Sequence, residues 1–123
     1  MYLCIESTER NNHHLILVDK NFQKECYSTE PFLLQAIEHF LSTEKILKNS
    51  IQGIAVVVGS GSFSSVRIAV TLANTWHYAL EIPVFGIEKK QIEEIENLYE
   101  KIFLEKKDTG FILPSYSGEP NIG

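Results

Sequence analysis

Apolar residues gather in three short segments at the start of the chain, in the pattern that β-strands show. The predicted strands cover residues 2–6, 13–19 and 22–27. Turn signals rich in asparagine separate them at residues 11–12 and 20–21. Because tight turns join antiparallel neighbours, the first three strands are predicted to form a meander.

The pattern changes to a helical period after residue 28. The segment 28–31 (Ser-Thr-Glu-Pro) offers an N-cap candidate and a proline near the first turn. The apolar residues that follow recur at helical spacing: Leu33, Ile37, Phe40 and Leu41. A helix is therefore predicted to begin here.

Residues 53–58 are apolar on both faces, which is typical of a central strand in a sheet that is covered on both sides. A Gly-Ser-rich turn at 59–62 leads to a predicted helix at 64–80, and residues 83–87 predict a fifth strand. Residues 90–106 predict a third, strongly amphipathic helix.

The predicted order of elements is βββαβαβα, in an α/β protein. Parallel strands need helical crossovers, whereas the first three strands can pair through hairpins. This succession is the ribonuclease H-like half-domain, the unit that is duplicated in the actin, sugar-kinase and Hsp70 folds. We expect one such domain at residues 1–110 and an extended tail at 111–123, which is rich in glycine and proline.

The composition indicates a globular protein of the cytoplasm. Of the 123 residues, 44% are hydrophobic and 22% are charged. No apolar run approaches the ~20 residues that cross a bilayer, and the N-terminus lacks the pattern of a secretory signal. Cys4 and Cys26 lie far apart in sequence, which favours reduced thiols.

The net charge of −5 argues against direct binding of nucleic acid. Neutralising phosphates requires clustered Lys and Arg, and the longest basic runs are the pairs Lys89-Lys90 and Lys106-Lys107. We therefore expect any link to RNA to pass through a partner.

No catalytic, metal or cofactor site is predicted. A two-metal nuclease needs converging carboxylates; Glu6 is suitably placed, but residues 58–61 carry no acid, and Asp19 and Glu38 are expected to face solvent. The turn at 59–65 lacks the Gly-Lys-Ser/Thr of a phosphate-binding loop and the third glycine of a dinucleotide-binding fingerprint. Its serines are predicted to serve as turn and N-cap residues, and the four histidines show no metal-ligand spacing.

The helix at 64–80 carries the strongest physical hint of a function. From Ser65 to Leu80 its only charged side chain is Arg67. Two apolar stripes run along it, the first formed by Val66, Ala69, Val70 and Ala73 and the second by Ile68, Leu72, Trp76 and Ala79. A helix on a sheet normally shows one apolar arc with charges opposite. The remaining face carries Arg67, Thr71, Asn74 and Tyr78. Either this face is covered by the chain's own tail or neighbouring helix, or it meets a partner.

The segment 53–69 resembles the signature of the TsaB family, a strand followed by G-P-G-S-F-T-G-L-R-I-G. The matching positions are Gly59, Gly61, Ser62, Phe63, Arg67 and Ile68. Residues 5–8 resemble the family's D-T-S opening, and 28–34 are similar to its H-S-E-x-L-L stretch. Ser60, Ser65, Ala69 and Glu6 depart from the pattern, and the chain resembles a one-lobe version of proteins that typically have two.

The resemblance implies a non-catalytic scaffold for the synthesis of threonylcarbamoyladenosine on tRNA. Such proteins pair through their first two helices with the catalytic subunit TsaD, and the ATPase TsaE joins the assembly. The implied interface residues are Leu34, Glu38, Arg67, Val70, Thr71, Asn74 and Tyr78. The alternatives are a self-associating TsaB-like orphan, which would form a homodimer, and a minimal nucleotide-dependent phosphotransferase.

Overall fold

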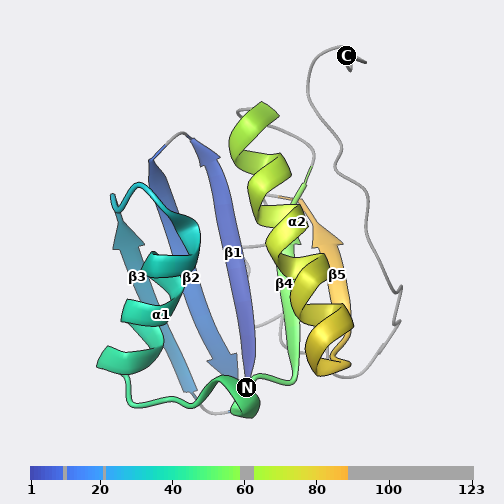
Figure 1. Cartoon of the computed structure of the whole chain (residues 1–123). Coiled ribbons are helices and arrows are strands. Elements are labelled where there is room, and N and C mark those ends of the chain that lie inside the picture. The colour runs from blue at the N-terminus through green and yellow to red at the C-terminus, as the bar shows by residue number, and fades with distance from the viewer. Residues whose placement is uncertain (10, 21, 59–62, 89–123) are drawn as a thin grey trace.

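A five-stranded mixed sheet forms the centre of the molecule (Figure 1). The computed structural model describes residues 1–9, 11–20, 22–58 and 63–88. The strands are β1 (Tyr2–Glu9), β2 (Asn12–Asp19), β3 (Phe22–Ser28), β4 (Gly53–Val57) and β5 (Val84–Ile87), in the spatial order β3-β2-β1-β4-β5. β1, β2 and β3 pair antiparallel, while β4 lies parallel to β1 and to β5.

Two helices lie against the same face of this sheet (Figure 1). They are α1 (Leu33–Thr43), which follows β3, and α2 (Phe63–Leu80), which connects β4 to β5. A short 3-10 turn, η1 (Lys48–Ser50), precedes β4. Because parallel neighbours need a crossover, α2 is the element that allows β4 and β5 to pair.

The main core lies between the two helices and the sheet. It joins alternate residues of the strands, such as Leu3, Leu15 and Val56, to the inner faces of α1 and α2. A second apolar cluster occupies the opposite face of the sheet, and its members are at most 6% exposed: Tyr2, Cys4, Ile16, Val18, Ala55, Val57 and Ile87. The central strands are therefore buried on both faces, as the apolar run at 53–58 predicts for β4.

The order of the described elements is the predicted one, with differences at their ends. β1 continues to Glu9, beyond the predicted end at residue 6, because polar residues keep up the pairing with β2 across a register shift. The third predicted helix (90–106) and the tail (111–123) lie outside the described residues. None of the helices that the structure describes has the length and apolar character needed to traverse a lipid bilayer.

The predicted cap of α1 is wrong. The helix begins at Leu33, and its N-cap residue is Phe32, which makes no side-chain capping bond. The Ser28 hydroxyl instead accepts a hydrogen bond from the Glu30 backbone N–H at 3.1 Å. This local bond closes a turn between β3 and the helix, a common alternative for a serine that precedes a helix.

Candidate functional site

The inner face of α2 is part of the core. Val66, Ala69, Val70 and Ala73 are each at most 2% exposed and pack in the cluster between the helices and the sheet. Trp76 is 7% exposed and belongs to the same cluster. This arc contains the whole of the first predicted stripe and Trp76 from the second, whereas Ile68 of the second stripe is 57% exposed.

The outer face of α2 is unusual because large apolar side chains lie open on it. Tyr78 is 77% exposed and Ile68 is 57% exposed. Arg67 and Thr71 are exposed as well, and Asn74 is half-buried. A shallow hollow of about 400 Å³ lies on this face, lined by Thr71, Asn74, Thr75, Tyr78 and Ala79.

A chain of contacts links this helix to α1. Glu38 on α1 forms an ion pair with Lys48 of η1, with 3.5 Å between Oε2 and Nζ. The Lys48 ammonium in turn lies 5.5 Å from the centre of the Trp76 ring of α2, a cation–π distance. Leu34, one turn before Glu38, is 43% exposed. The exposed Glu38 of α1 is thus connected through η1 to the buried Trp76 of α2.

The predicted interface residues separate into two groups. Leu34, Glu38, Arg67, Thr71 and Tyr78 are exposed, and Asn74 is half-buried. Val70 is the exception and requires a correction, since it is 2% exposed and packs in the core. Its place one residue before Thr71 carries it round to the inner face of the helix.

The predicted motif turn lies largely outside the described residues. Gly59, Gly61 and Ser62 are not described, and Phe63 is the first residue of α2. The helix therefore begins one residue before the predicted start at 64.

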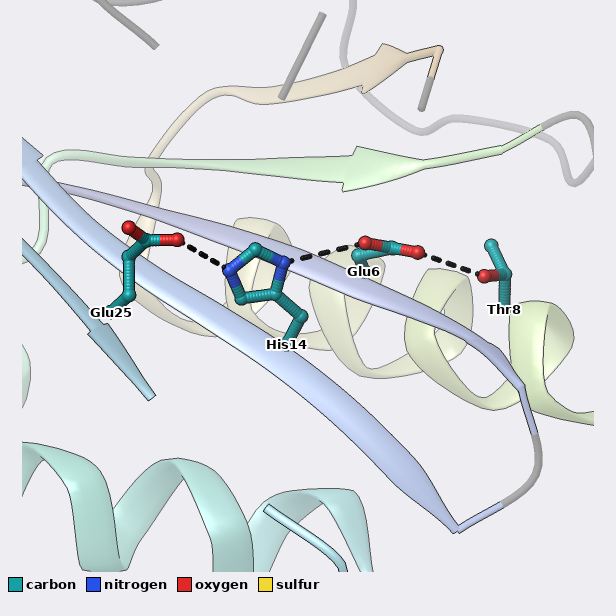
Figure 2. Close-up of polar contacts among 4 residues, drawn as sticks. All are labelled: Glu6, Thr8, His14 and Glu25. Atoms are coloured by element: carbon teal, nitrogen blue, oxygen red, sulfur yellow. Dashed lines mark hydrogen bonds and ion pairs between the residues drawn. The ribbon is translucent and has the colours of Figure 1, made fainter. Parts of the chain in front are cut away.

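A polar cluster that the sequence does not predict lies across β1, β2 and β3 (Figure 2). His14 lies between two carboxylates, with Nδ1 at 3.4 Å from Glu6 and Nε2 at 2.8 Å from Glu25. The Thr8 hydroxyl donates a hydrogen bond to the Glu6 carboxylate at 3.0 Å. The Tyr27 ring stacks on His14 with 4.2 Å between ring centres.

This cluster shows what the Glu6 carboxylate does in the described structure. Glu6 and His14 are paired directly in the β1–β2 register, so their side chains lie on the same face. Glu6 therefore lies within a strand and contacts its neighbours, rather than ending the strand. Within the described residues, no group of three or more acidic, histidine or cysteine side chains is arranged to hold a metal ion. The signal in the sequence is the pair His13-His14, whose members alternate between faces.

The other histidines make contacts within the fold. His13 is 6% exposed; its Nδ1 lies 2.7 Å from the Ser7 hydroxyl and its Nε2 lies 2.9 Å from the Glu30 carbonyl oxygen. The imidazole thus joins the first hairpin to the segment that enters α1. His77 Nδ1 lies 2.6 Å from the Ile82 carbonyl oxygen, at the end of α2.

Both cysteines are free thiols, as predicted. Burial raises the pKa of the Cys4 thiol to about 12. Desolvation raises the pKa of the half-buried Cys26 thiol too, and the negative charges of Glu30 and Glu44 add to this effect. Neither thiol resembles the low-pKa group that a nucleophilic cysteine requires.

The fold of this chain is similar to that of solved bacterial proteins. The structure of YeaZ from Pseudomonas aeruginosa matches with a TM-score of 0.63 at 22% identity, over 71% of this chain and 44% of that one. A protein with similarity to peptidase YeaZ from the same organism matches with a TM-score of 0.62 at 22% identity, over 72% of this chain and 44% of that one. The protein is therefore an α/β protein with the ribonuclease H-like, actin-like fold, as predicted.

Sequence similarity identifies the family of the chain. The chain belongs to the family described as "TsaD: tRNA N6-adenosine threonylcarbamoyltransferase", whose model matches residues 31–110. It is also 39% identical over 64 residues to the tRNA threonylcarbamoyladenosine biosynthesis protein TsaB of Buchnera aphidicola subsp. Baizongia pistaciae. That match covers 51% of this chain and 29% of the relative, and it confirms the predicted TsaB-like resemblance. The matched parts thus span less than half the length of the relative and of the solved structures.

Proposed function

We propose that this chain is a non-catalytic partner subunit in the synthesis of threonylcarbamoyladenosine on tRNA, in the cytoplasm. In this proposal it pairs with a TsaD-like catalytic subunit through the outer faces of α1 and α2, and a TsaE-like ATPase joins the complex. Family membership and the TsaB relative support the pathway. The exposed apolar face of α2 is the observation that carries the pairing.

The chemistry of that face suits an interface. Interfaces are enriched in aromatic residues and arginine and depleted of lysine and acids, and the face presents Tyr78, Arg67 and Ile68. Tyrosine and arginine are also the types that most often dominate binding energy. The hollow beside Tyr78 can receive a side chain from the partner, and the small Thr71 lets a partner helix approach closely.

A charge placed on this face separates an interface role from a structural one. Thr71→Glu should leave folding nearly unchanged, because substitutions of exposed residues shift stability by less than about 0.5 kcal/mol. Burying an uncompensated carboxylate in an interface costs several kcal/mol, so binding to a TsaD-like subunit should weaken by about a hundredfold or more. Gln23→Glu, at an exposed residue of β3 that lies on neither helix, is the control that adds the same charge and should bind like the parent.

Sedimentation of each variant, alone and with a TsaD-like protein, measures these outcomes. If Thr71→Glu binds as tightly as the parent, the proposed interface is wrong. If that variant unfolds, the face of α2 that carries Thr71 belongs to the core. If the unmodified protein self-associates and does not bind the TsaD-like protein, the result would support the alternative of a TsaB-like orphan, which forms homodimers.

The name of the matched family is that of a transferase, so catalysis requires its own test. The proposal expects that the purified chain alone neither hydrolyses ATP nor modifies tRNA. Magnesium-dependent turnover that Glu6→Ala abolishes would show instead a catalytic protein, including the phosphotransferase alternative. Glu6→Gln serves as the control because it keeps the size of the side chain that contacts His14 and Thr8.

A further inference from the structure

A groove that the proposed pairing does not use runs between α1 and β3. It has a volume of about 560 Å³ and is lined by Glu25, Cys26, Tyr27, Ser28, Thr29, Glu30, Ala36, His39, Phe40, Thr43 and Glu44. The lining residues of α1 recur every three or four positions, so they form one stripe that faces the strand. The volume is that of a site for a few side chains or a small ligand.

The strand that borders this groove is the edge of the described sheet. β3 pairs with β2 on one side, and among the described strands none pairs with its other side (Figure 1). Such an edge presents a row of backbone N–H and C=O groups to any extended chain that approaches it. Phe22 and Tyr27, at the two ends of the strand, are 39% and 76% exposed.

The groove is acidic. Two glutamates place their carboxylates beside it, Glu30 and Glu44, and the lining contains no lysine or arginine. Glu25 contributes to the lining from β3, but its carboxylate contacts His14 on the opposite face of the sheet. His39 of α1 lies 3.5 Å from the Glu30 carboxylate. Burial raises the pKa of the Cys26 thiol, which also lines the groove, and the negative charges of Glu30 and Glu44 add to this effect.

We infer that this edge and groove bind an extended basic segment of a partner protein, which adds as a strand to β3 and places a lysine or arginine among the glutamates. Backbone hydrogen bonds along β3 provide the affinity in this mode of recognition, and side-chain pockets beside the strand provide the specificity. A long cationic side chain matches the groove in size and in charge.

The charges on β3 disfavour a second copy of the chain as the occupant. Two copies of β3 that pair antiparallel along their whole length place Glu25 opposite Glu25, since that residue is the centre of the strand. Like charges directly opposite in a sheet are destabilising. Lys24 and Glu25 therefore protect the edge against self-pairing and leave it open to a strand of different sequence.

Binding of a short peptide of alternating arginine and valine to the 123-residue chain tests the inference. Titration followed by backbone amide NMR should move the signals of β3 and of the α1 stripe, with an affinity that falls as salt is added. A peptide with glutamate in place of arginine should not bind. A third peptide, with alternate backbone nitrogens methylated, keeps the charge, cannot pair as a strand, and should also fail.

Two sets of variants locate the contact. The double variant Glu30→Gln/Glu44→Gln should weaken binding of the arginine peptide by about fivefold or more, the range of exposed ion pairs. Glu81→Gln, an exposed glutamate that follows α2 and lies outside the groove, should bind like the parent. Equal binding of the methylated peptide, or no loss in the double variant, would overturn the inference. Self-association through the β3 amides would do so as well.

Discussion

The middle of the sheet and its β3 edge are built from sequences of opposite character. All five residues of β4 are buried, and β1 beside it has Leu3, Cys4 and Ile5 at 0% exposure. In β3, five of seven residues are exposed and the other two are half-buried. The difference shows that the composition of a strand indicates its position in the sheet. A continuous apolar run is typical of a central strand, whereas charged residues such as Lys24 and Glu25 are typical of an edge strand.

A carboxylate in the middle of the sheet should have the largest effect. Val56 is fully buried in β4, so Val56→Asp places an unpaired charge in the core. We expect a loss of more than about 4 kcal/mol, which is most of the stability of a small domain. Far-UV circular dichroism and urea unfolding measure this loss. A cooperative, nearly normal transition would contradict the central position of Val56.

A single methyl group at the start of β4 should have a smaller but clear effect. A Cβ at Gly53 would lie 2.5 Å from the ring of the buried Tyr2, so Gly53→Ala forces the ring or the strand to shift. Overpacking of this kind costs about 1–3 kcal/mol. In a double-mutant cycle by urea unfolding, Tyr2→Val should relieve part of that cost. Strict additivity would show that the ring is not the cause.

The reaction rates of the two thiols should also differ between the centre of the sheet and its β3 edge. Cys26 in β3 should react with an alkylating reagent faster than Cys4 in β1 by about tenfold or more, because Cys4 is buried and the thiolate is the reactive form. Glu30→Gln should accelerate Cys26, since removing a negative charge lowers its raised pKa and increases the thiolate fraction at pH 8. Mass spectrometry of peptides measures both rates. Equal rates for the two cysteines would contradict the difference in burial between β1 and β3.

An aspartate introduced at the β3 edge should affect stability much less than Val56→Asp does in the centre of the sheet. Gln23 is exposed on β3, and Gln23→Asp should change the free energy of unfolding by less than about 0.5 kcal/mol. Urea unfolding beside Val56→Asp provides the direct contrast. A loss of several kcal/mol at Gln23 would mean that β3 is covered and is not an open edge.

Sequence reasoning recovers the elements whose pattern is local. The run at 53–58 predicts the buried strand β4, and the helical period predicts α2 within one residue of its observed start. These predictions succeed because the period of the apolar residues depends on the secondary structure of each segment alone. The contrast between the faces of α2 also follows from sequence, apart from Val70, which lies at the border of the buried arc.

Features that depend on the pairing register of the strands cannot be predicted from the apolar pattern of each segment. The contact of His14 with Glu6 and Glu25 requires the exact pairing of three strands, and β1 and β2 shift register between Glu6 and Glu9. The late start of α1 depends on a local bond between Ser28 and Glu30 that competes with capping. A one-residue change in register moves a side chain to the other face, so composition cannot place these residues.

The parallel pairing of β1 with β4 also determines the order in which the chain can fold. β1, β2 and β3 are joined by short turns, and these hairpins can form while the rest of the chain is still being synthesised. Tyr2, however, pairs with Gly53, so the other side of β1 stays open until β4 has left the ribosome and the loop between them has closed. During that interval an apolar strand is exposed at an open edge, which is the kind of intermediate that aggregates or recruits chaperones. The strand at the centre of the finished sheet thus precedes the other four in the chain, yet one of its sides stays open until the fourth strand has been made.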